Sequence, residues 1–301
     1  MSTLISSILA GLFLGATFGL IALGYSMVYG VLRLINFAHG DIFMLGGFVS
    51  FSIFNAFGMK GTVSWLALVG VGLLTALITG GVGVAAEELV YRQMRSAPML
   101  SLIVATLGVS MIIENAVLNI PPWGAKFRPF PVGTSSSGFY VLNQRYTYLQ
   151  LVIVCIAIAL FIGVYLVVQR TIIGVSMRAV ATDRAAASLV GVNVNRVIAT
   201  VFFVGGSLAG AAAVMYSLYY GQINYLMGFN LGLQAFTAAV LGGIGNVTGA
   251  VVGGMLLGIF QSLGVAYTGS QWALVFSFAA LVLVLWLRPT GLLGERMGSR
   301  T

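Results

Sequence analysis

The chain has 301 residues, of which 59% are hydrophobic and only 7% are charged, and its formal net charge is +8. Soluble domains carry about 25% charged residues, so this composition excludes an ordinary soluble protein and indicates that lipid is the main solvent. A charge of +8 would suggest nucleic-acid binding in a soluble protein. Here the arginines lie between apolar runs, as in the loops of membrane proteins, and no nucleic-acid partner is expected.

Apolar runs bounded by charged or turn residues follow one another along the chain. They cover 4–32, 41–57, 62–86, 98–118, 148–168, 197–220, 232–245, 249–267 and 271–287. A helix needs about 20 apolar residues to cross the hydrocarbon core, whereas barrel strands alternate over about ten residues. We therefore expect an all-α, polytopic integral membrane bundle of about eight spans, forming one transmembrane domain over 1–301.

The charges on alternate loops predict the orientation of the bundle. The first run has no basic residue before Arg33 and is too long for a signal-peptide core, so we expect a retained first span with its N-terminus outside. The inner loops then hold most of the basic residues: Arg33, Arg92, Arg95, Arg170, Arg178, Arg184, Arg196, Arg288, Arg296 and Arg300. The outer loops hold Lys60, Lys126, Arg128 and Arg145. This asymmetry agrees with the positive-inside rule.

The longest polar stretch assigned to the outside is the loop 119–147. Its four prolines and the run Ser135–Gly138 exclude a long helix. Trp123 suits the membrane interface. The loop is either a lid or docking surface for an external partner, or a plain connection.

Two groups of glycines have different expected roles. The first has the small-residue spacing that lets transmembrane helices approach closely, and it comprises Gly11, Gly15, Gly19, Gly206, Gly210, Gly249 and Gly253. The second should interrupt a helix, and it comprises Gly242, Gly243, Gly245 and the adjacent Asn246. Broken helices at membrane depth occur where backbone is buried in protein or lines a cavity, so this segment is a candidate pathway element. The surrounding stretch 232–267 either crosses twice or is re-entrant.

Four polar residues within or beside the apolar runs are further pathway or gate candidates. Asn36, His39 and Asp41 lie where the second run begins, and they either bond a neighbouring span and fix an inner gate or cap the helix at the interface. Glu114 lies near the outer end of its run, where it could meet the ammonium group of a solute, although contact with water is the favoured interpretation. A lone histidine does not indicate a metal site.

The segment 170–196 lies between two apolar runs and predicts a cytoplasmic protrusion. Its centre, Ser176 to Val190, is Ala-rich and carries charges, so it should form one short helix too polar to span. Gly191 should end that helix, and Asn193 or Asn195 should cap the next. A short helix protruding between two spans is what a membrane subunit needs if a motor subunit is to move it.

Four blocks carry a resemblance to a known family. They are GVSMRAVATDRAAASLVGVNVNRV at 174–197, LINFAHGDIFMLGG at 34–47, LGGIGNVTGAVVGGMLLG at 241–258 and LRPTGLLG at 287–294. Together they resemble bacterial branched-chain amino acid ABC importer permeases, in particular the smaller of the two permease subunits. The loop 119–147 carries no signature of that family, so it says little about the solute.

The resemblance implies a multi-pass protein of the bacterial inner membrane that imports branched-chain or related small amino acids. Its partners would be a second, paralogous permease, two cytoplasmic ATPase subunits and a periplasmic solute-binding protein, with membrane lipid around the bundle. ATP and magnesium would bind the ATPase subunits, and this chain would hold no cofactor. The resemblance assigns the coupling segment to contact with the ATPase, through Arg178, Ala179, Asp183, Arg184 and Gly191.

The residues themselves argue against an enzyme. The only lysines, Lys60 and Lys126, follow Met59 and Ala125, so no Gly-Lys-Ser/Thr motif for phosphate binding exists. One histidine and one cysteine do not supply a clustered catalytic site.

Alternative transport functions stay open. Relatives of the family carry urea or short amides. An ion-coupled secondary transporter usually places ionisable residues at the midplane, and the uncharged stretch 197–287 weakens that alternative.

Overall fold

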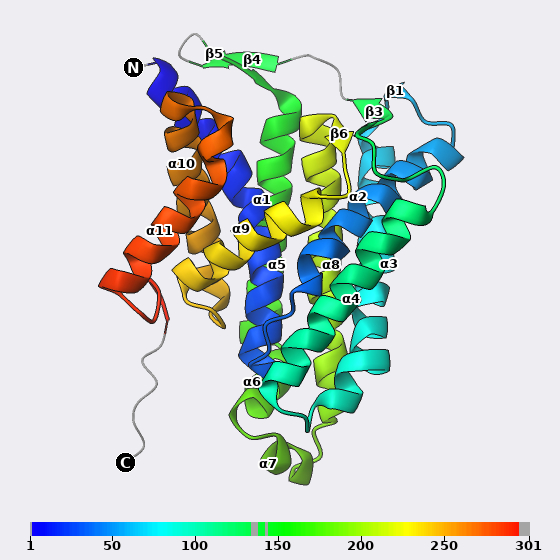
Figure 1. The fold of residues 1–301 in the computed structure, drawn as a ribbon, viewed down its shortest axis with the longest axis vertical. Helices are drawn as coiled ribbons and strands as arrows, with labels where there is room; N and C mark the ends of the chain where they lie inside the picture. Colours follow the sequence, from blue (N-terminus) through cyan, green and yellow to red (C-terminus); the bar gives the residue numbers. More distant parts are fainter. Residues whose placement is uncertain (1, 134–137, 142–143, 295–301) are drawn as a thin grey trace.

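The computed structural model describes residues 2–133, 138–141 and 144–294 as a bundle of helices (Figure 1). This confirms the predicted helical membrane protein. In the described part of the chain, 7 helices are long and apolar enough to cross a membrane. They are built on α1 (Ser2–Leu32), α3 (Trp65–Ala86), α4 (Met99–Asn119), α5 (Tyr148–Arg170), α8 (Val194–Tyr220), α10 (Val247–Thr268) and α11 (Ala273–Leu287). Short turns at Glu87–Tyr91 and Arg92–Met94 continue α3, and another at Ser270–Trp272 precedes α11.

Two of the predicted apolar runs form helices that do not belong to these seven. Helix α2 (Ala38–Ala56) has 19 residues, and its polar residues, among them His39 and Asp41, lower its hydropathy. Helix α9 (Met227–Gly242) has only 16 residues, a length of about 24 Å against a hydrocarbon core of about 30 Å. It runs obliquely between α2 and α10 in Figure 1. The predicted break is present, because α10 begins only at Val247.

Glycines set the closest helix contacts. Helix α1 packs most extensively on α10, where a Cβ on Gly15 would lie 2.8 Å from the Met255 Cα and one on Gly11 would lie 2.6 Å from the Ile259 Cα. The backbones of α1 and α10 are thus so close that these positions have no room for a side chain, as in other closely packed pairs of transmembrane helices. The remaining glycines of this predicted group also face close neighbours: Gly19 faces Phe161, Gly206 and Gly210 face Thr79, and Gly249 and Gly253 face Gly242.

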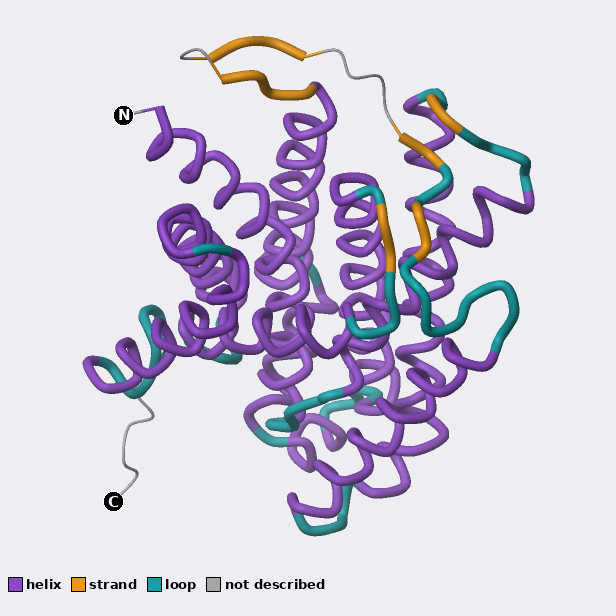
Figure 2. The backbone as a smooth tube through the Cα atoms, turned by 45° about the horizontal axis from the view of Figure 1, so that its top comes forward, coloured by secondary structure: helices purple, strands orange, loops and turns teal. Residues whose placement is uncertain are grey.

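The two ends of the bundle differ. The N-terminus and the hairpin of β4 (Gly138–Val141) with β5 (Gln144–Thr147) lie at the upper end in Figures 1 and 2, and helices α6 (Ile172–Thr182) and α7 (Arg184–Leu189) lie at the lower end. The Arg184 guanidinium donates to the Leu32 carbonyl at 3.2 Å. The loops after α1 and α5 therefore share the lower end, as alternating spans require. Two predicted inner arginines, Arg296 and Arg300, lie outside the described residues.

The described residues of the loop 119–147 form no long helix, as predicted, and they are tied to the bundle. Strand β1 (Gly61–Thr62) pairs with β3 (Val132–Gly133), and β2 (Arg128–Pro129) pairs with β6 (Gln222–Ile223). The Trp123 indole donates to the Ser52 hydroxyl of α2 at 2.7 Å. Residues 123–133 of this loop therefore lie against the upper ends of α2 and α8. Ser135–Ser137 of the predicted polar run lie outside the described residues.

Candidate functional site

The segment expected to contact an ATPase holds two short helices, α6 and α7, so the prediction of one helix over 176–190 is wrong. The backbone of Asp183 is extended, with φ −154° and ψ 114°. Its Oδ1 accepts hydrogen bonds from the Ala185 and Ala186 amides at 2.8 and 3.0 Å. Asp183 thus ends α6 and caps α7, because its short side chain competes for the backbone donors that a continuous helix would use.

Two arginines of the segment, Arg178 and Arg184, bond to their own chain. Arg178 donates to the Val168 carbonyl near the end of α5, and Arg184 reaches the end of α1 as described above. Ala179 is half-buried. The guanidinium groups therefore hold α6 and α7 against the bundle, a role that the expected contact with an ATPase did not include.

The predicted end of the segment is confirmed in part. Gly191 takes the left-handed conformation, φ 86°, after α7. The Asn193 Oδ1 caps α8 by accepting from the Arg196 amide at 3.0 Å. Asn195, the other predicted cap, instead accepts from Arg95 at 2.7 Å.

The surface of α7 that faces away from the bundle is small and apolar. Leu189 and Val190 are 87% and 79% exposed, and Ala185 and Ala186 are also exposed. We call these four residues the coupling face. Large apolar side chains this exposed outside a membrane-spanning segment mark an interaction surface when they cluster. Sequence analysis missed Leu189 and Val190, although an apolar pair directly before Gly191 was a usable signal.

The polar residues at the start of α2 are buried and bonded to neighbouring helices. Asn36 is 1% exposed and Asp41 is 4% exposed. The Tyr91 hydroxyl donates to the Asn36 Oδ1 at 3.0 Å, and the Ser110 hydroxyl of α4 donates to the Asp41 carboxylate. These contacts fit the first interpretation, in which the residues join neighbouring spans.

Asp41 also lies at the first turn of two helices. It is in the first turn of α2, and a Cβ on Gly228, near the start of α9, would lie 2.5 Å from its Oδ1. The positive end of a helix dipole stabilises a carboxylate. Glu114, one turn beyond Ser110 on α4, is half-buried and within electrostatic reach of Asp41. Asp41 therefore connects α2, α4 and α9.

His39 fills a hole that glycines leave between three helices. It is 2% exposed and lies edge-on to the Tyr25 ring, with centroids 4.7 Å apart. A Cβ on Gly24 of α1 would lie 2.6 Å from the His39 Cε1, and one on Gly205 of α8 would lie 3.6 Å from it.

The tight contact between Gly24 and His39 leads to a first prediction. Gly24→Ala is expected to destabilise the protein by about 1–3 kcal/mol, the usual cost of overpacking a filled core. Thermal unfolding of the detergent-solubilised protein would measure this. In the double variant Gly24→Ala/His39→Ala the two effects should be less than additive. Full additivity would contradict the packing described here.

The break between α9 and α10 is covered by the C-terminal block. Gly243 and Gly245 have φ of 104° and 95°. The Leu292 and Leu293 amides donate to the Leu241 and Gly242 carbonyls, both at 2.9 Å. This pairing satisfies carbonyls that end α9. The motifs at 241–258 and 287–294 thus form one structural unit, and the break faces protein.

Asn246 holds this unit together and supplies a second prediction. Its Oδ1 accepts from the Gly249 amide and its Nδ2 donates to the Leu293 carbonyl, each at 2.9 Å. Asn246→Ala removes both a helix cap and the hydrogen bond to the Leu293 carbonyl. It should therefore lower the free energy of unfolding by about 1–3 kcal/mol. Asn230→Ala, at an exposed position of α9, is the matched control in thermal unfolding. Equal stability of the two variants would contradict the assignment.

The predicted pathway residues therefore form two groups. One joins α2 to α4 and α9, and the other closes the junction of α9 with α10.

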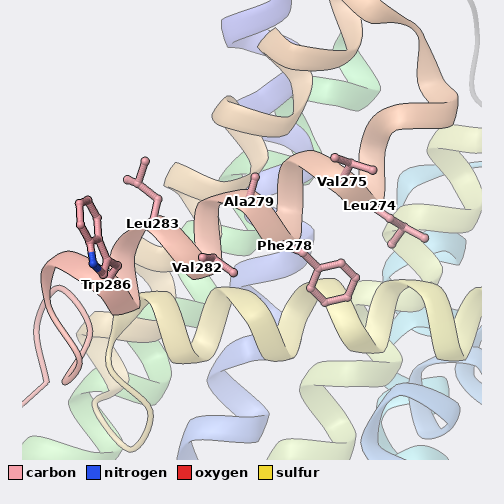
Figure 3. Close-up of a pocket in the computed structure, with 7 residues that line it drawn as sticks. All are labelled: Leu274, Val275, Phe278, Ala279, Val282, Leu283 and Trp286. Carbon is pink, nitrogen blue, oxygen red and sulfur yellow. The ribbon is translucent and has the colours of Figure 1, made fainter.

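Within the described residues, no group of three or more His, Cys, Asp or Glu side chains could hold a metal ion. A surface groove on α11 is lined only by apolar residues (Figure 3): Leu274, Val275, Phe278, Ala279, Val282, Leu283 and Trp286. It is the kind of surface that a helix presents to lipid.

These features define a class of protein. In its described residues the chain is a bundle with seven candidate spans, packed through glycine and carrying an exposed apolar face at one end, which defines a polytopic helical membrane protein. The family described as branched-chain amino acid transport system, permease component, matches residues 7–285. The chain belongs to this family, and it is a transport permease.

Relatives align over nearly the whole chain. It is 37% identical to the high-affinity branched-chain amino acid transport system permease protein BraD of Pseudomonas aeruginosa. It is 39% and 38% identical to the LivH permease proteins of Salmonella typhimurium and Escherichia coli K12. Each alignment covers 95% of this chain and 94% of the relative. No solved structure matches the chain.

Proposed function

We propose that this chain is a permease subunit of an ATP-driven importer of branched-chain amino acids in the bacterial inner membrane. The observation that carries the proposal is the end-to-end similarity to permeases named for that transport system. The N-terminus lies outside, because this orientation places the arginine-rich loops in the cytoplasm. ATP and magnesium bind partner subunits, since the chain lacks a phosphate-binding lysine motif.

We assign the pore, the hydrolysis of ATP and the delivery of solute to different subunits. A second, paralogous permease completes the pore, two ATPase subunits supply the work, and a periplasmic binding protein delivers the solute. The coupling face on α7 docks in the ATPase, because its apolar side chains are exposed and α7 lies at the lower end of the bundle (Figure 1), the end of the arginine-rich loops. An apolar, helical anchor in a groove is a common docking mode.

Selectivity lies mainly with the binding protein. Residues 197–287, which hold most of α8 and all the later helices, carry no Asp, Glu, Lys or Arg. A passage of this kind lets a zwitterion with an aliphatic side chain pass without trapping it, because it offers no strong ionic partner.

Competition for uptake tests the solute assignment. Proteoliposomes containing the complete complex should take up labelled leucine with ATP, and unlabelled isoleucine and valine should compete. Urea and acetamide are the controls for the other solutes carried by relatives of the family. Uptake of urea or acetamide in place of leucine would refute the proposed solute class.

A further inference from the structure

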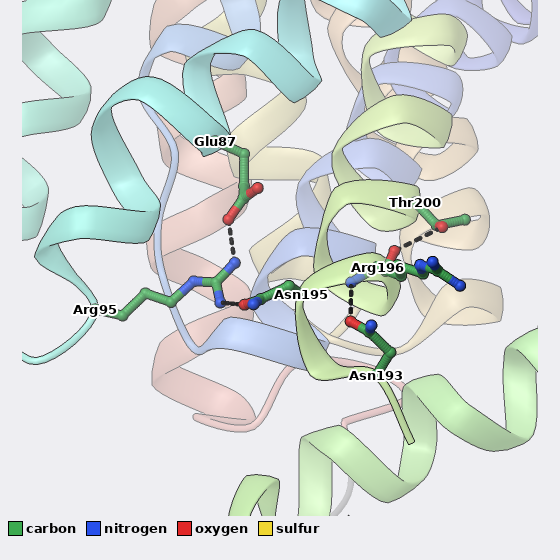
Figure 4. A network of polar contacts seen from close by, with 6 residues as sticks. All are labelled: Glu87, Arg95, Asn193, Asn195, Arg196 and Thr200. Atoms are coloured by element: carbon green, nitrogen blue, oxygen red, sulfur yellow. Dashed lines mark hydrogen bonds and ion pairs between the residues drawn. The ribbon is translucent and has the colours of Figure 1, made fainter. Parts of the chain in front are cut away.

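The end of α3 contains a local change of helix type that surrounds a buried charge. The turn Glu87–Tyr91 is a π-helix and Arg92–Met94 is a 3₁₀-helix. Such irregular turns often mark functional positions. Glu87 is 1% exposed and pairs with Arg95, whose side chain is 17% exposed (Figure 4).

Arg95 joins this turn to the start of α8. While one guanidinium nitrogen pairs with Glu87, the other donates to the Asn195 Oδ1 at 2.7 Å. Figure 4 shows Arg95 lying between the two side chains. Asn195 lies two residues after the Asn193 cap of α8, and the residues before that cap include α7. Arg95 therefore connects α3 to the helix that a moving α7 would displace.

The same turn of α3 contacts the loop between α1 and α2. The Tyr91 hydroxyl donates to Asn36 at 3.0 Å, and Arg184 of α7 donates to the Leu32 carbonyl at 3.2 Å. The loop 33–37 is thus held just before its start by α7, through Leu32, and near its end by the turn that continues α3, through Asn36. It leads directly into the buried polar residues of α2.

The charges around this loop are unbalanced. Burial, together with the nearby Arg95 and Arg33, lowers the pKa of the Arg184 guanidinium. The bond from Arg184 goes to a neutral carbonyl, whereas Arg95 is held by the buried Glu87 carboxylate. The ion pair between Glu87 and Arg95 therefore anchors the cluster. The hydrogen bonds that Arg184 of α7 and Asn195 of α8 make are the contacts that can change partner.

We propose that Arg95 is a positioning residue that transmits movement of the coupling segment, through Asn195 on one side and the Glu87–Tyr91 turn on the other, to the polar residues of α2. This inference rests on the proposed function, because it requires α7 to be moved by an ATPase. Coupling of this kind needs a chain of contacts with two discrete arrangements. Here the chain runs from α7 through α8 and α3 to Asn36.

The decisive variant is Asn195→Leu, because Asn195 is exposed and its loss leaves the Glu87–Arg95 pair intact. In proteoliposomes holding both permeases, the ATPase and the binding protein, we measure solute transported per ATP hydrolysed. This ratio should fall at least about fivefold, the lower end of usual coupling effects, while ATP hydrolysis stimulated by loaded binding protein persists. Asn195→Asp keeps an acceptor for Arg95 and should restore the ratio.

Arg95→Met supplies a second variant and Arg92→Met its matched control, since Arg92 is exposed in the same turn. Arg95→Met should lower the ratio at least as much as Asn195→Leu, and Arg92→Met should leave it unchanged. An unchanged ratio in Asn195→Leu, beside normal wild-type uptake, would refute this inference alone. A wild-type complex without ATP-driven uptake would refute the proposed function and the inference with it.

Discussion

Gly258→Val is expected to prevent stable assembly of the bundle. A Cβ at this position of α10 would overlap the backbone of Gly15 in α1, so no side-chain rotation can relieve the clash. Overpacking a core usually costs about 1–3 kcal/mol. We expect the upper end or more here, because two long helices would have to separate. The amount of folded protein recovered from membranes, and its thermal unfolding temperature, measure the effect.

The control for this variant is Gly163→Val on α5. A Cβ there meets nothing within 4 Å, so the substitution places an apolar side chain in lipid and should leave stability unchanged. Recovery of Gly258→Val at the level of Gly163→Val would show that α1 and α10 do not pack as described.

Leu189→Glu is expected to abolish ATP-dependent uptake. The side chain is 87% exposed, so the folded permease tolerates the change. A carboxylate in an apolar docking groove, however, would be desolvated without a partner. Uptake should fall at least about tenfold, which corresponds to about 1.4 kcal/mol of docking free energy. Capture of solute by the binding protein should be unaffected.

Ser96→Glu is the matched control for Leu189→Glu, because it adds the same charge at an exposed position of another loop at the same end. Co-purification of the ATPase with each variant separates docking from later steps. If Leu189→Glu retained the ATPase and transported normally, the coupling face would be wrongly assigned. Arg178→Glu is a less specific probe, because Arg178 also bonds to Val168.

Sequence was sufficient for features that depend on local pattern. Runs of about 20 apolar residues predict spanning helices. The Asn193 cap and the stop at Gly191 follow from side-chain and backbone preferences of single residues. The break at 243–246 was equally visible, because Gly243 and Gly245 take conformations that favour glycine.

Features that depend on distant parts of the chain could not be read in this way. Asp183 lies within an Ala-rich stretch, and only its extended backbone reveals that it caps a second helix. Arg95 and Asn195 are 100 positions apart, and no local pattern predicts their bond. The pairing of Leu292 with Leu241 is likewise a tertiary contact. The short α9 was also ambiguous, because an apolar run can cross the bilayer or be buried in protein.

The central claim is that a separate ATP-hydrolysing partner drives transport through this chain. The most direct measurement is uptake of labelled leucine into vesicles containing the two permeases, with the ATPase, the binding protein and ATP each omitted in turn. We expect uptake only when all are present together. Uptake driven by an ion gradient in the absence of ATP would contradict the account.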